Sequence, residues 1–179
     1  MADRLADTSQ VCVAVHGWAH HNHAGPHEKK QELGAHRPAE TVLGELRAGL
    51  GKLRSLNGSR ALPMLVPPWN RIASELLPGL TSIGFAALST FGPPKPGPIR
   101  AVNCTVDLID WHGTRGCVDP AHLVKLIAGQ LAGPEPVGIL AHHLVHDAAA
   151  WAFLETLCAK TRAAGAEWLT GESLIRTPA

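Results

Sequence analysis

The chain has 179 residues, a length typical of one domain with a sizeable core. Its net charge is +1, with 16 Lys and Arg against 15 Asp and Glu. Because its basic residues are also scattered, nucleic acid is excluded as the main partner. No apolar run approaches the roughly 18 residues that span a bilayer, and the first seven residues lack the apolar core of a signal peptide. Four separated cysteines predict free thiols, so we expect a cytoplasmic protein.

Apolar patterning predicts strands that alternate with helices along the chain. Short apolar runs predict strands over residues 11–15, 64–66, 84–90, 102–106, 137–141 and 167–169. Apolar spacings of three and four, with cap residues, predict helices over residues 38–56, 70–77, 119–131 and 147–165. Repeated β–α units of this kind predict an α/β fold with a mainly parallel sheet.

Two histidines four residues apart follow the first predicted strand. On a helical turn, His16 and His20 would face the same way and could share one divalent metal ion. The preceding strand would place this ion at the carboxyl end of the sheet, where α/β proteins usually carry out chemistry. In a chain with 11 histidines, the same spacing also fits a pair of surface residues, so both interpretations stay open here.

Three further clusters follow predicted strands, and each also has a purely structural interpretation. Trp69, after two prolines, offers a flat apolar wall or simply stiffens a turn. Asp107 and Asp110, beside Trp111, suit a site where one acid orients a base, or a solvated turn with a cap. His142 directly follows an apolar strand, which is rigid support for a general acid or base.

In this order, the four clusters resemble the motifs of the polysaccharide deacetylase family, carbohydrate esterases related to chitooligosaccharide deacetylase. His16 and His20 match the histidines of H-[ST]-x-x-H, with Gly17 in place of the hydroxyl residue that normally steadies the loop. VPPW at 66–69 matches R-x-P-[FYW] except at the arginine, which Arg71 could supply. The last two motifs, D-x-x-D-W and an apolar pair before x-H, are matched by DLIDW at 107–111 and ILAH at 139–142. The resemblance covers roughly residues 11–157.

The resemblance implies a partial, distorted β/α barrel and hydrolysis of the acetamide groups of an amino-sugar oligo- or polysaccharide. It implies that His16 and His20 hold a divalent metal ion, most simply zinc. His142 would be the catalytic acid, oriented by Asp110. The family's sugar-binding groove would be walled by Trp69 and Trp111, with Arg71 also binding substrate and Asp107 supporting the site.

The first family motif, T-F-D-D, is absent. Its first aspartate is the general base and its second is the third metal ligand, whereas Asp3 and Asp7 here precede the first predicted strand. We therefore expect one incomplete domain over residues 1–179 that lacks its first strand–helix units, roughly 60 residues. Weak metal binding and little or no activity should follow. Self-association through an exposed sheet edge should also follow, as Val13, Val15 and Leu65 lose their cover.

Two other functions remain open. The chain could be a non-catalytic remnant that acts as an interaction subunit, which predicts oligomers and no turnover. It could instead be a His-rich metal-binding protein, which predicts several weak metal sites that survive the loss of His142. The histidines in question are His20, His21, His23, His27, His142, His143 and His146.

Overall fold

The computed structural model describes residues 10–176, which fall into two compact units. The first unit comprises residues 10–90, 94–102 and 169–176, and the second comprises residues 91–93 and 103–168. Asp3 and Asp7 lie outside the described residues. The interpretation of residues 1–179 as a single incomplete domain stays a prediction, and each unit is described by itself.

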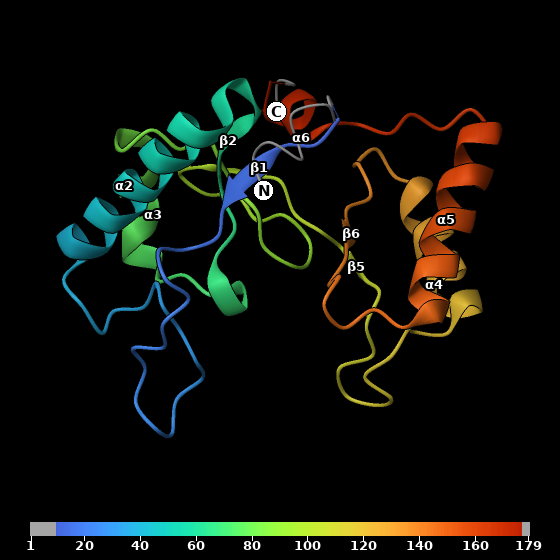
Figure 1. Cartoon of the computed structure of the whole chain (residues 1–179), viewed down its shortest axis with the longest axis horizontal. Helices are drawn as coiled ribbons and strands as arrows, with labels where there is room; N and C mark the ends of the chain where they lie inside the picture. Colours follow the sequence, from blue (N-terminus) through green and yellow to red (C-terminus); the bar gives the residue numbers. More distant parts are fainter. Residues whose placement is uncertain (1–9, 177–179) are drawn as a thin grey trace. The chain divides into compact units, whose positions relative to one another are not determined.

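A four-stranded parallel sheet forms the centre of the first unit (Figure 1). Its strands, in sheet order, are β1 (Val13–Val15), β2 (Ala61–Leu65), β3 (Ala87–Leu88) and β4 (Arg100–Ala101). β1 is an edge strand of this sheet. The register between β1 and β2 shifts along their length. The predicted α/β class with a parallel sheet is therefore confirmed at this level.

The helix predicted over residues 38–56 is α2 (Ala39–Asn57). Val42, Leu46 and Leu50, spaced by four, are fully buried on its inner face. Leu56, which continues the same apolar spacing in the last turn of the helix, is 58% exposed. This helix supplies the largest part of the first unit's core.

Two strand residues contradict the expectation that truncation uncovers the sheet. Val15 and Leu65 belong to the core cluster that includes the inner face of α2, and they are 4% and 0% exposed. Only Val13, nearer the start of the edge strand, is partly exposed. Within the described residues, the helix itself therefore covers the strand side chains that we expected to lose their cover.

The segment after β2 differs from the predicted helix over residues 70–77. The chain forms two short 3₁₀ turns, Pro68–Asn70 and Ser74–Leu76, before α3 (Leu77–Ser82) begins. Pro78 was expected to end a helix but lies in the first turn of α3, where the missing N–H of proline would have no intrahelical partner. At the end of the chain, residues 167–169 form no strand and α6 (Gly171–Arg176) follows instead.

The second unit has a parallel strand pair, β5 (Val106–Asp107) and β6 (Ile139–Leu140), and two longer helices. The helices are α4 (Pro120–Leu131) and α5 (Ala148–Ala163), which lie side by side in Figure 1. The strand expected over residues 102–106 is wrong as a single element, because the boundary between the units falls between residues 102 and 103.

Both predicted cap residues of these helices are confirmed. Asp119 accepts a hydrogen bond from the backbone N–H of His122, and Asp147 accepts one from that of Ala150. The core packs Leu123 and Ile127 of α4 against Phe153 of α5 and the strand region. Leu126, Leu131 and Trp151 belong to the apolar spacing that predicted these two helices, but they are 40–56% exposed. No helix among residues 10–176 is long and apolar enough to cross a membrane.

Candidate functional site

His16 directly follows β1 in the first unit. Its Nδ1 lies 2.8 Å from the carbonyl oxygen of Val66, the residue after β2. Because a carbonyl only accepts, Nδ1 must carry the proton, and Nε2 of the neutral ring then has a free lone pair. The ring is exposed. A backbone hydrogen bond that fixes one nitrogen and leaves the other free is the usual arrangement of a metal-binding histidine.

His20 lies close to His16, although the segment between them is a loop and not the expected helical turn. Gly17 and His20 have positive φ angles of 70° and 56°, which reverse the chain locally. The ring centroids of His16 and His20 are 5.1 Å apart. A left-handed backbone is uncommon for a histidine, and such strain is concentrated at functional sites. The structure therefore brings the two predicted metal ligands together by a route that their spacing did not indicate.

Trp69 completes this group of rings. Its ring centroid lies 4.2 Å from that of His20, and its own φ of 51° is also left-handed. Arg71, predicted to bind substrate, donates from Nη1 to the carbonyl oxygen of Lys30 at 3.0 Å. The arginine is thus tied to the loop before Glu32. Its role toward substrate stays a prediction, as does that of Trp69.

Glu32 is a residue of this site that the sequence analysis missed. It is 1% exposed, and its Oε1 accepts from the backbone N–H groups of Trp18 and Ala19 at 3.2 and 2.7 Å. Its Oε2 is buried without a hydrogen-bond partner among the residues that the structure describes. A Cβ atom at residue 17 would overlap Oε2, so the glycine makes room for the carboxylate. We call His16, Gly17, His20, Glu32 and Trp69 the His16 cluster.

A second cluster lies in the second unit, where β5 and β6 end. Asp107 pairs with Leu140 in the register of the two strands, and His142 follows two residues later. Nε2 of His142 lies 3.1 and 3.2 Å from the two carboxylate oxygens of Asp107. The side chains are 28% and 19% exposed. The carboxylate therefore holds the imidazole with Nε2 protonated.

Trp111 completes this second group, which we call the His142 cluster. Its indole Nε1 donates to Oδ2 of Asp107 at 3.0 Å, and its ring meets that of His142 edge-on with centroids 4.9 Å apart. Oδ1 of Asp107 also accepts from the backbone N–H of Ile109 at 2.9 Å. Three donors thus converge on one carboxylate. The arrangement fixes both the imidazole and the indole.

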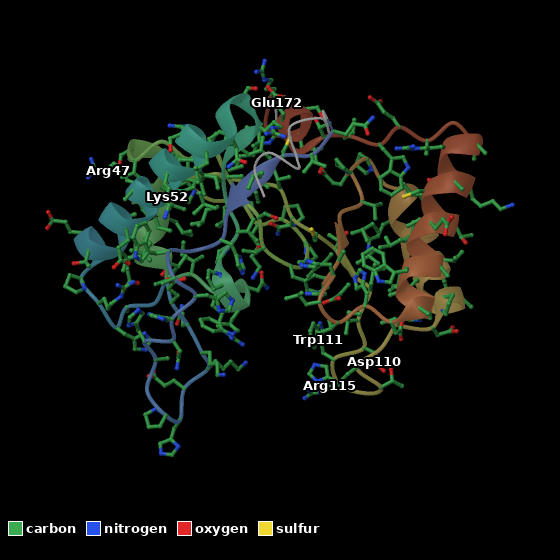
Figure 2. The ribbon with its side chains drawn as sticks, in the orientation of Figure 1. Arg47, Lys52, Asp110, Trp111, Arg115 and Glu172 are labelled. Atoms are coloured by element: carbon green, nitrogen blue, oxygen red, sulfur yellow. The ribbon has the colours of Figure 1, made fainter. Side chains whose placement is uncertain are left out.

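The prediction that Asp110 orients His142 is wrong, because Asp107 makes this contact. The two oxygens of Asp110 instead accept from the backbone N–H groups of Gly113 and Thr114, at 3.0 and 3.1 Å. Figure 2 shows Asp110 with Trp111 and Arg115 on the loop after β5. Asp107 is the last residue of β5, the strand that pairs with β6. Asp110 lies in the loop after β5, and its carboxylate binds the backbone of that loop.

His146 supports His142 from the same loop. The backbone N–H of His142 donates to Nε2 of His146 at 2.9 Å, so this nitrogen must be unprotonated. The ring of His146 also packs edge-on against Trp151, with centroids 4.7 Å apart. His146 thus holds the backbone of His142 in place and is itself held by the ring of Trp151.

Asp147 joins two loops of the second unit. Beyond capping α5, its Oδ2 accepts from the backbone N–H of Cys117 at 3.0 Å. Hydrogen bonds from the backbone of Cys117 and then Ala150 lower the pKa of Asp147. Burial raises the pKa of the thiol of Cys117, and more weakly so does the negative charge of Asp147. A thiol held protonated in this way is a poor nucleophile.

The two clusters lie in separate units, so their convergence on one substrate stays a prediction. Among residues 10–176, no group of three or more His, Cys, Asp or Glu side chains is arranged to hold a metal ion. The donor set near His16 fits a divalent ion in its chemistry, with two imidazoles of which one has its tautomer fixed, but it is short of a third ligand.

Comparisons with known proteins add no relative. No protein-family model, no curated protein and no solved structure matches this chain.

Proposed function

We propose that the chain has the architecture and part of the active site of a metal-dependent polysaccharide N-deacetylase. In this proposal, its parallel strands are part of a distorted, incomplete β/α barrel, and its substrate is an amino-sugar oligo- or polysaccharide with acetamide groups. The observation that carries the proposal is the contact of His142 with Asp107 and Trp111 at the ends of two parallel strands. The fixed tautomer of His16 beside His20 supports it.

The His142 cluster is suited to protonate a leaving amine. Asp107 accepts from Nε2, so the second proton of a charged His142 ring lies on Nδ1. The carboxylate also orients the ring, as in other carboxylate–histidine pairs. Water adds to the acetamide carbon and loses a proton to solvent, and as the C–N bond breaks, Nδ1 gives its proton to the sugar nitrogen. The products are acetate and the free amino sugar.

The His16 cluster would hold the divalent ion. A zinc-like ion held by His16 and His20 would supply Lewis-acid chemistry, polarising the acetamide carbonyl and lowering the pKa of bound water. His16 presents Nε2 because Nδ1 is engaged by the carbonyl of Val66. The exposed ring of Trp111 would stack on the apolar face of a sugar. We assign the general base to none of the described residues, so the proposed activity of this chain alone is weak or absent.

The proposal is tested by substrate binding as well as by turnover. Acetylated chitooligosaccharides are titrated while tryptophan fluorescence is followed, and acetate release is measured at high protein concentration with added zinc or cobalt. We expect binding that weakens in Trp111→Phe. Any acetate release should be lost in His142→Ala and kept in His143→Ala, its exposed neighbour and matched control.

Two results would contradict this function. One is the absence of both binding and acetate release. The other is equal acetate release by the His142→Ala and His143→Ala variants, which would leave the His142 cluster without a catalytic role.

A further inference from the structure

Glu32 is a buried carboxylate, and hydrogen bonds within the first unit engage only one of its two oxygens. It is 1% exposed, and Oε2 has no hydrogen-bond partner among the described residues. Removing a carboxylate from water is costly unless its oxygens are paired, and buried unpaired groups are rare in folded proteins. An unpaired buried oxygen of this kind needs a physical reason.

The position of Glu32 supplies a first part of the reason. Oε1 accepts from the amides of Trp18 and Ala19, which lie in the loop between His16 and His20. Gly17, at the start of this loop, has no Cβ and leaves the space that Oε2 fills. Glu32 therefore steadies the loop from outside it.

Glu32 is itself rigidly held. The carbonyl of the next residue, Leu33, accepts from the backbone N–H of Ala73 at 2.8 Å, and Leu33 also forms an isolated bridge with Ile72. Arg71 holds the carbonyl of Lys30, two residues before Glu32. A side chain fixed on both sides can fix the loop that it binds.

These hydrogen bonds do not require a negative charge. The amides of Trp18 and Ala19 need only an acceptor, which the oxygen of a glutamine would also provide. Two neutral imidazoles compensate none of the charge of a dication. A buried carboxylate next to their loop supplies one compensating unit of negative charge, and because it is buried, water screens this charge less than it screens an exposed carboxylate.

We propose that Glu32 is a positioning residue for a divalent cation at His16 and His20. It holds the connecting loop through Oε1, and its buried charge replaces part of the charge that a third, acidic ligand would supply. This inference rests on the metal site of the proposed function. It does not make Glu32 a ligand.

The test is a titration of Co²⁺ and Zn²⁺ by calorimetry and by the Co²⁺ absorption spectrum, with thermal unfolding measured with and without metal. Glu32→Gln keeps an acceptor for the two amides but removes the charge. We expect it to unfold, without metal, no earlier than the unchanged chain and to bind metal at least tenfold more weakly. Glu28→Gln removes an exposed carboxylate from the same loop and should leave metal affinity unchanged.

A second variant separates charge from geometry. Glu32→Asp keeps the charge on a shorter arm, so it should bind metal more tightly than Glu32→Gln even if the loop is weakened. Equal losses in both variants, or early unfolding of both without metal, would mean that Glu32 is only structural and would overturn the inference.

His16→Ala separates the existence of the metal site from the role of Glu32 at that site. Equal metal binding by His16→Ala and the unchanged chain would remove the metal site and this inference with it. If His16→Ala loses binding while Glu32→Gln keeps full affinity, the site stands and only the role of Glu32 is overturned.

Discussion

Replacing Asp107 by asparagine should change the tautomer of His142. Three N–H donors converge on the Asp107 carboxylate, from the backbone of Ile109, the indole of Trp111 and the ring of His142. An amide has one oxygen, so in either orientation its NH₂ group faces at least one of these donors. Of the three donors only the His142 ring can change tautomer, so we expect it to move its proton to Nδ1 and accept from the new NH₂ group at Nε2, while the other N–H that faces this group loses its acceptor.

The cost follows from the bonds lost. The bond between His142 and the carboxylate is assisted by charge and partly buried, and bonds of this type contribute about 1.5–3 kcal/mol. A loss of about 2 kcal/mol would lower the melting temperature of a chain of this size by roughly 4–8 °C. Asp110→Asn, which disturbs only the turn closed by Gly113 and Thr114, should cost about 1 kcal/mol and leave His142 unaffected.

The assay is nitrogen NMR of the imidazole rings, which distinguishes the two neutral tautomers, combined with thermal unfolding. It needs no turnover, so it applies even if the chain is inactive. The reasoning is refuted if His142 keeps its proton on Nε2 in Asp107→Asn, or if Asp110→Asn shifts the tautomer as much. Either result would mean that Asp107 does not set the state of this ring.

Two further predictions concern the whole chain. The pKa of Asp147 is lowered in the folded state, so its stabilising contribution is full above its ordinary pKa and is lost as pH falls through the lowered value. Asp147→Ala should therefore lower the free energy of unfolding at neutral pH and reduce its dependence on pH in the acid range. An unchanged pH dependence in that range would contradict this. The edge position of β1 predicts self-association, which sedimentation velocity would detect as dimers or larger species; a monomer at all concentrations would remove this expectation.

The sequence predicted the long helices best. α2 was predicted because its apolar residues recur every three or four positions, and α4 and α5 because an aspartate caps each. The strands are only two to five residues long, which is too short for a clear alternation, so their ends were less accurate. The expected strand over residues 102–106 failed because alternation does not reveal that the chain passes between two units there.

The candidate site was predicted in its residue types but not in its pairings. D-x-x-D-W offers two carboxylates, and their spacing does not tell which one meets His142. Strand register decides this, because Asp107 lies opposite Leu140, two residues before His142. Asp110 lies beyond the end of the strand, and its carboxylate accepts a hydrogen bond from the backbone N–H of Gly113 in its own turn. Register is a property of two distant segments, so no local pattern could have assigned the pair.

Glu32 shows the same limit more clearly. Nothing about its immediate neighbours marks it as buried, because a carboxylate in a polar loop is usually solvated. The one related signal in the sequence is the glycine at position 17, which has no side chain to bind the amides of its own loop. That absence leaves the N–H groups of Trp18 and Ala19 in need of an acceptor, and the structure supplies one from more than a dozen residues away. Gly17 and Glu32 are therefore two halves of one feature: the missing Cβ leaves the space that Oε2 fills, and the carboxylate does the work that a side chain at position 17 could not.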